Sequence, residues 1–148
     1  MGEQTCWNSI DQEETVPLRW YSTVVDCHDV SAQATWWAAA LDWKKAYEAH
    51  DEVVLVPQHA TLELVQSLPW EQVPPGLVFV PVPEGKAVKN RLHLDLAPHT
   101  TDDRDAEIAR LVAAGATRVD VGQDDGATWV VLADPEGNEF CVLSARDR

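Results

Sequence analysis

Basic residues are scarce in this 148-residue chain, which has 11 Lys and Arg against 25 Asp and Glu and a formal net charge of -14 at pH 7. A surface of that charge repels phosphate backbones and anionic lipids. The main basic group is small and comprises Lys86, Lys89 and Arg91. The longest apolar runs, such as residues 36–41 and 53–56, are far too short to cross a membrane. The sequence therefore predicts neither a nucleic-acid partner nor a membrane partner.

Cysteine is equally sparse. Cys6, Cys27 and Cys141 are widely spaced and form no Cys-x-x-Cys pair, so a disulfide framework is disfavoured. Reduced thiols are typical of cytoplasmic proteins, and we expect a cytoplasmic location. Residues 1–17 lack the basic and apolar regions of a secretory signal. They are polar and without periodicity, which predicts a flexible N-terminal arm, with Trp7 as a residue that could dock on the body.

Two copies of one pattern account for the rest of the chain. A strand, a helix and three further strands are predicted within residues 18–83 and again within residues 89–144. Residues 61–66, between two strands of the first copy, fit either a short helix or an edge strand. Repeats of this size indicate duplicated supersecondary units that close over a shared space. We therefore predict an α+β fold, with one domain over residues 18–148.

Alternation along the predicted strands separates two faces of each sheet. Leu92, Leu94 and Leu96 are expected beneath the second helix, as alternate residues from Tyr21 to Val25 are beneath the first. The opposite, inward face then carries the candidate ligand-binding side chains, which are Trp20, Ser22, His93, Asp95, Glu139 and Cys141. Aromatic rings beside acidic groups suit a flat or cationic organic molecule.

Three stretches carry a resemblance to a known family. They are residues 25–29 with the tryptophan-rich residues 36–43, residues 89–96, and residues 128–140, which contain the turn sequence Asp-Pro-Glu-Gly-Asn. At the positions that they occupy in the two copies of the repeat, these stretches resemble the vicinal oxygen chelate superfamily (glyoxalase/bleomycin-resistance/dioxygenase). In detail they are similar to its actinobacterial glyoxalase-like members. The resemblance implies two βαβββ modules that form a curved mixed sheet around a cup-shaped cavity, with the helices outside. It also implies a homodimer.

Metal-dependent members of this superfamily hold a divalent ion with a His or Gln on each module's first strand and a carboxylate on each last strand. Matched residue by residue, the first-strand positions fall on Ser22 and His93, and the carboxylate of the second module falls on Cys141. The last strand of the first module contains no acid, amide or His. Because only His93 is retained, we predict no metal and no other cofactor. The alternative is a divalent transition metal bound by a rearranged set around His93, with Asp95, Glu139 or Cys141.

Three functions are compatible with these residues. The leading hypothesis is a glyoxalase-like protein that binds a small organic ligand in the cup without a metal, either as a binding module or as an enzyme that uses His93. A carboxylate such as Asp95 can orient and polarise an imidazole for general-base catalysis. The second is a metal-dependent lyase, isomerase or dioxygenase, and the third is a non-catalytic partner domain. A fold alone does not separate them, because function resides in the site.

Overall fold

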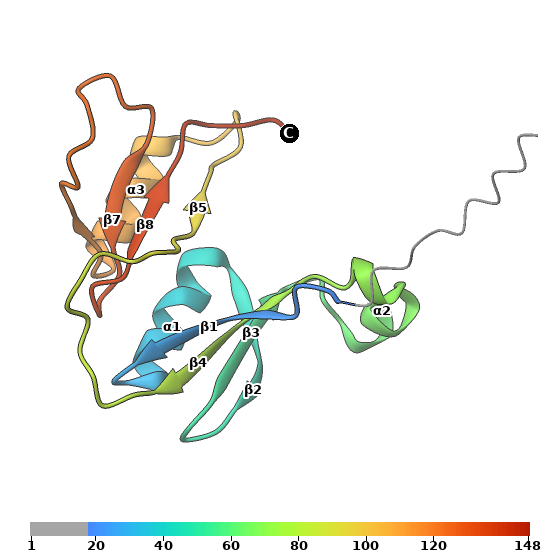
Figure 1. Cartoon of the computed structure of the whole chain (residues 1–148). Helices are drawn as coiled ribbons and strands as arrows, with labels where there is room; N and C mark the ends of the chain where they lie inside the picture. Colours follow the sequence, from blue (N-terminus) through green and yellow to red (C-terminus); the bar gives the residue numbers. More distant parts are fainter. Residues whose placement is uncertain (1–17) are drawn as a thin grey trace, which may run out of the picture.

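The structure is a computed structural model that describes residues 18–148. The expected arm of residues 1–17, including Trp7, lies outside the described residues. The described chain forms two units in succession, and each contains one mixed sheet with a helix against it (Figure 1). No helix among the described residues has the length and apolar character needed to cross a membrane.

The first unit contains four strands, the longest helix of the described residues (α1) and a short one (α2). In chain order its elements are β1 (Ser22–Cys27), α1 (Val30–Leu41), β2 (Trp43–Glu48), β3 (Val53–Pro57), α2 (Leu62–Ser67), a short 3₁₀ turn (Trp70–Gln72) and β4 (Gly76–Pro81). The sheet order is β1-β4-β3-β2. Strands β1 and β4 run parallel, and the other pairs are antiparallel.

The second unit repeats this topology with shorter strands. Its elements are β5 (Asp95–Leu96), α3 (Arg104–Ala113), β6 (Thr117–Arg118), β7 (Val130–Ala133) and β8 (Glu139–Val142). The sheet order is β5-β8-β7-β6, again with the first and last strands parallel. The α+β fold and the repeated βαβββ pattern are thereby confirmed. The strands are hydrogen-bonded as two four-stranded sheets rather than one continuous sheet.

Local signals in the sequence fix the helix ends. The Asp29 carboxylate accepts the Ala32 N–H at the start of α1, and the Asp103 carboxylate accepts two backbone N–H groups at the start of α3, as N-caps do. Gly115, with φ of 120°, follows the C-cap residue Ala114 of α3. Thr61 caps α2 through its hydroxyl, which decides between the two predictions for residues 61–66 in favour of a helix.

Helix α1 joins the two units into one hydrophobic core. Trp36 and Trp37 lie on this helix, and both make edge-on contacts with the Phe140 ring of β8, at centroid distances of 5.8 and 5.2 Å. The Trp36 indole N–H also donates to the Ala114 carbonyl at 3.1 Å, just after α3. Figure 1 shows α1 between the first sheet and the second unit. The tryptophans of α1 therefore set how the two units lie against each other.

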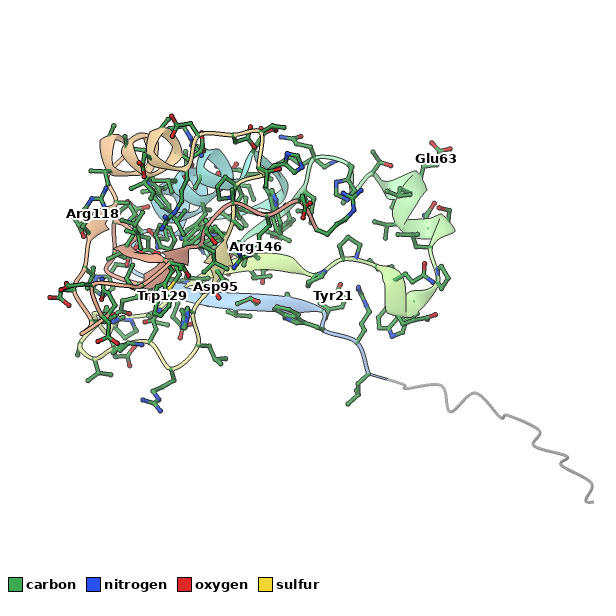
Figure 2. All side chains as sticks on the ribbon, turned by 90° about the horizontal axis from the view of Figure 1, so that it is seen from above. Tyr21, Glu63, Asp95, Arg118, Trp129 and Arg146 are labelled. Carbon is green, nitrogen blue, oxygen red and sulfur yellow. The ribbon has the colours of Figure 1, made fainter. Side chains whose placement is uncertain are left out.

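Two of the predicted strand beginnings are wrong. Strand β1, which pairs with β4, begins at Ser22, so Tyr21 does not lie under α1. Tyr21 is 65% exposed, and the Arg19 guanidinium lies over its ring. Figure 2 shows Tyr21 at the end of β1 that is nearer α2. Strand β5 begins only at Asp95, and Leu92 is 89% exposed instead of packing under α3. Leu92 is misplaced because strand alternation holds only where a neighbouring strand supplies hydrogen bonds, and within the described residues no strand pairs with residues 91–93.

Candidate functional site

A cavity of about 430 Å³ lies at the seam between the two units. We call it the main cavity. Its walls come from Trp20 and β1, from Trp37 of α1, from the linker of residues 82–94 and from the β7–β8 hairpin. Its apolar side chains include Trp20, Val24, Leu92 and Phe140, and its polar ones include Asp26, His93, Asn138 and Glu139. A largely apolar wall with a few polar groups is typical of small-molecule sites.

A second cavity of about 430 Å³, the side cavity, adjoins the first. It shares Asp26 and Asn138 with the main cavity. The rest of its wall is more polar and includes Glu84, Lys86 and Glu136. Asp26 therefore lies where the two cavities meet.

His93, Asp95 and Cys141 form one cluster beside the main cavity. The parallel pairing of β5 with β8 places Asp95 opposite Cys141. The His93 Nε2 atom lies 3.3 Å from Asp95 Oδ1, and the three potential ligand atoms of the cluster all lie within 4.8 Å of one another. Burial and the Asp95 carboxylate raise the pKa of the Cys141 thiol, although Lys89 acts in the opposite direction. The thiol is thus neutral near pH 7 unless a metal ion displaces its proton.

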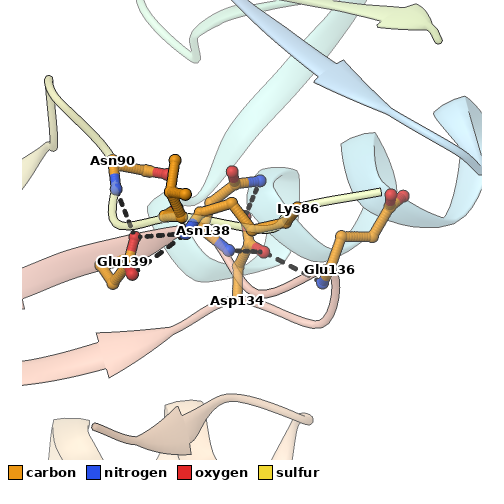
Figure 3. Close-up of polar contacts among 7 residues, drawn as sticks. Lys86, Asn90, Asp134, Glu136, Asn138 and Glu139 are labelled. Carbon is orange, nitrogen blue, oxygen red and sulfur yellow. Dashed lines mark hydrogen bonds and ion pairs between the residues drawn. The ribbon is translucent and has the colours of Figure 1, made fainter. Parts of the chain in front are cut away.

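Glu139 is held by the linker. Its carboxylate accepts the Asn90 backbone N–H at 3.0 Å and pairs with Lys86 Nζ at 3.0 Å (Figure 3). Burial alone would raise the pKa of Glu139, but these bonds outweigh it, and the pKa is lowered from its usual range. The charge of Glu139 is therefore already compensated within the protein.

Asp134, in the turn that the sequence singled out, is buried, and its carboxylate accepts five hydrogen bonds, among them those from Glu136 and Asn138 (Figure 3). Two come from α1, namely Gln33 Nε2 at 2.5 Å and Trp37 Nε1 at 2.9 Å. The others come from its own turn. Glu136 in the same turn accepts the His28 N–H at 2.6 Å and the Asp29 N–H at 3.1 Å, immediately before α1. The turn motif therefore connects the second unit to the first.

The structure brings some of the predicted ligand-binding residues together and leaves others apart. Trp20, His93 and Glu139 line the main cavity. Asp95 and Cys141 cluster with His93 but are not in the cavity wall. Ser22 lies in neither cavity wall, and its carbonyl accepts the Trp20 indole N–H at 3.1 Å.

Sequence reasoning missed other residues of the wall, including Asp26, Asn90, Asn138 and Phe140. The turn sequence Asp-Pro-Glu-Gly-Asn could have indicated Asn138 as a wall residue, because this turn places the Asn138 side chain next to the start of β8. Asp26 had no signal of its own, since its position depends on how the two units pack.

The Glyoxalase-like domain family model matches residues 22–143. The chain belongs to this family. The match spans both units and includes β1, the linker and β8, which supply most of the main cavity wall. The cavity therefore lies entirely within the glyoxalase-like domain except for Trp20. Among proteins with curated descriptions, none matches the sequence.

Several solved structures have a similar fold. A glyoxalase/bleomycin resistance protein/dioxygenase family enzyme from Burkholderia phytofirmans is similar with a TM-score of 0.62 and 15% identity, over 87% of this chain and 100% of that chain. The fosfomycin resistance protein FosX from Mesorhizobium loti has a TM-score of 0.59 and 11% identity, over 84% and 90%. A FosX variant from Listeria monocytogenes, in complex with Mn(II) and a dihydroxypropylphosphonic acid, has a TM-score of 0.61 and 8% identity, over 88% and 92%. At these identities the likeness shows the fold alone.

Proposed function

We propose that this glyoxalase-like domain binds a small organic molecule in the main cavity, without a metal ion. The observation that carries the proposal is the cavity itself, which has about 430 Å³ of space between the units and a wall in which apolar side chains surround a few polar ones. That volume is within the usual range of small-molecule sites. The exposed ring of Trp20 offers a surface for stacking, which suits an aromatic or cationic ligand.

His93 is the candidate for chemistry in this cavity. It lines the wall, and its Nε2 atom lies beside the Asp95 carboxylate at 3.3 Å. A carboxylate in that position can orient an imidazole for proton transfer, which is what a general base requires. If the protein is an enzyme, we expect a glyoxalase-like lyase or isomerase in which His93 moves the proton and Asp95 positions it.

Tryptophan fluorescence tests the binding proposal. We expect an aromatic or cationic compound to quench the emission in metal-free buffer. The quenching should be reduced in Trp20→Phe and retained in Trp129→Phe, because Trp129 is also exposed but lies outside the cavity wall. Absence of binding across a broad library, together with capture of a specific protein partner, would instead favour a non-catalytic partner domain.

The second candidate is a metal-dependent lyase, isomerase or dioxygenase, and the cluster of His93, Asp95 and Cys141 is the observation that favours it. Imidazole, carboxylate and thiolate donors within 4.8 Å of one another suit a borderline-soft ion such as Zn²⁺. They do not suit Mn(II), the ion of the Listeria FosX complex, because Mn(II) prefers oxygen donors. A bound ion would supply Lewis-acid polarisation of a substrate oxygen.

Metal analysis separates the two candidates. The protein is purified without a His-tag and without chelators, and the metal content is measured by mass spectrometry. Our first proposal predicts a substoichiometric content that does not change in His93→Ala. A stoichiometric transition metal that is lost in His93→Ala and in Cys141→Ala would establish the second candidate instead.

Two further proposals concern the oligomeric state of the protein and its location in the cell. We propose a homodimer, because Trp20, Val24 and Leu92 leave exposed apolar surface at the rim of the main cavity. Sedimentation analysis would test it. We also propose a cytoplasmic location, in keeping with the free thiols of Cys27 and Cys141, and a closer kinship to actinobacterial glyoxalase-like proteins.

A further inference from the structure

The acidic residues of the main cavity wall are Asp26, Asp134 and Glu139. They differ in whether their charge is already compensated. Asp134 accepts five hydrogen bonds, and Glu139 pairs with Lys86 and the Asn90 N–H. Asp26 is exposed, and within residues 18–148 its carboxylate has neither a hydrogen bond nor an ion pair. It is the one carboxylate of this wall that can accept a new partner without breaking an existing contact.

In the wall of the side cavity, too, Asp26 is a carboxylate whose charge is not compensated. Its Glu136 carboxylate is occupied by the His28 and Asp29 N–H groups. Lys86 is occupied by Glu139 and the Val88 carbonyl. Asp26 and Glu84 therefore remain as its uncompensated carboxylates within the described residues. Of these two carboxylates, only Asp26 also lines the main cavity, so the uncompensated negative charge of the main cavity lies where the two cavities meet.

Apolar surface faces the same space. Trp20 precedes β1, and Val24 lies on β1 two residues before Asp26. Leu92 from the linker and Phe140 from β8 add further apolar surface to the wall. A ligand with an apolar body and one cationic group would place its body against these side chains and its charge at Asp26. The ring face of Trp20 adds cation–π attraction for such a ligand.

We propose that Asp26 is the residue that recognises a cationic ligand, and that the ligand is an organic monocation with an apolar or aromatic body. The inference rests on the proposed function, because it assigns a ligand class to the same cavity. The acidic surface of the protein, with a net charge of -14, raises the local concentration of such cations. Neutral compounds of the same shape keep the apolar contacts but lose the contact with Asp26.

An isosteric pair of probes tests the assignment. Phenyltrimethylammonium carries one positive charge, and tert-butylbenzene has nearly the same shape without the charge. Ligand-observed NMR measures the weak binding of both. We expect the cation to bind about fivefold more tightly than the isostere at low salt, as a partly solvated ion pair allows. The preference should disappear in Asp26→Asn and return in Asp26→Glu.

Matched controls separate the possible outcomes. Asp125→Asn removes an exposed carboxylate that lines neither cavity, and it should keep the preference. Equal binding of both probes, or a preference that responds to Glu84→Gln and not to Asp26→Asn, would overturn the role of Asp26 while leaving the binding cavity intact. Failure of both probes to bind would overturn this inference and remove support from the proposed function as well.

Discussion

The indole N–H of Trp37 donates a hydrogen bond of 2.9 Å to the buried carboxylate of Asp134. Trp37 lies on α1 of the first unit, and Asp134 begins the β7–β8 turn of the second. The same indole packs against Phe140 at a centroid distance of 5.2 Å. One side chain thus supplies both a polar and an apolar contact between the units, next to the cavity that they enclose.

Replacement of Trp37 by phenylalanine should separate these two contributions. Trp37→Phe keeps an aromatic ring near Phe140 but removes one donor to a buried charge, which contributes about 1.5–3 kcal/mol. We expect a loss of about 2 kcal/mol in the free energy of unfolding, measured by urea denaturation. Trp43→Phe is the matched control, because Trp43 is only partly buried and its indole N–H makes no hydrogen bond within the described residues. Equal losses in the two variants would contradict the importance of the bond to Asp134.

Glu139 should control the mobility of the linker. Within the described residues, every hydrogen bond that ties residues 83–92 to the rest of the chain ends on the Glu139 carboxylate. Glu139→Gln removes the charge that holds Lys86 and weakens the bond from Asn90. We expect trypsin to cleave after the exposed Lys89 and Arg91 several-fold faster in this variant, because proteolysis follows local opening. Glu84→Gln changes an unpaired acid of the same linker and should leave the cleavage rate unchanged.

Glu139 should also make the stability of the protein depend on pH in the acidic range. Because the pKa of Glu139 is lowered in the folded protein, its contribution to stability is present above the unfolded value of about 4.5 and is lost as the pH falls through the folded value. The free energy of unfolding of the wild-type protein should therefore decrease more steeply below about pH 4.5 than that of Glu139→Gln. Parallel curves for the two proteins would show that Glu139 does not titrate as the geometry requires.

Some of the site follows from the sequence, and the rest depends on packing. Strand alternation predicted Asp95 and Cys141 on one face, and the pairing of β5 with β8 places them opposite each other. His93, just before β5, completes the cluster. The role of Asp26 was missed because it depends on the orientation of the second unit, which the contact of α1 with Phe140 sets. The bond from Asn90 to Glu139 was missed because the linker has no periodicity that a pattern could indicate. Leu92 was misplaced because its alternation with Leu94 and Leu96 begins before the strand does, at Asp95.

Titration of the Cys27 thiol should make the stability of the protein depend on pH in the alkaline range. Burial, followed by nearby carboxylates, of which Glu136 is the strongest, raises the pKa of its thiol from 9.0 to about 11. A raised pKa means that stability is fully present below the unfolded value and is lost as the pH rises through the folded value. We expect the free energy of unfolding to fall by about 2 kcal/mol between pH 9 and pH 11 on account of this group. Cys27→Ala should flatten that part of the curve, and an unchanged slope would contradict the assignment.

Cys141 should become more reactive when Asp95 is neutralised. After burial, the Asp95 carboxylate is the main cause of the raised pKa of this thiol, and the thiolate is the reactive form. Asp95→Asn leaves the thiol buried but removes the repulsion, so the rate of alkylation by iodoacetamide at Cys141 should rise several-fold near pH 8. Lys89→Gln should have the opposite effect, because Lys89 lowers the pKa. Peptide mass mapping reads each cysteine separately, and Cys27 in the same sample serves as the internal control. A rate at Cys141 that increases together with the rate at Cys27 would indicate general loosening of the fold instead of a local charge effect.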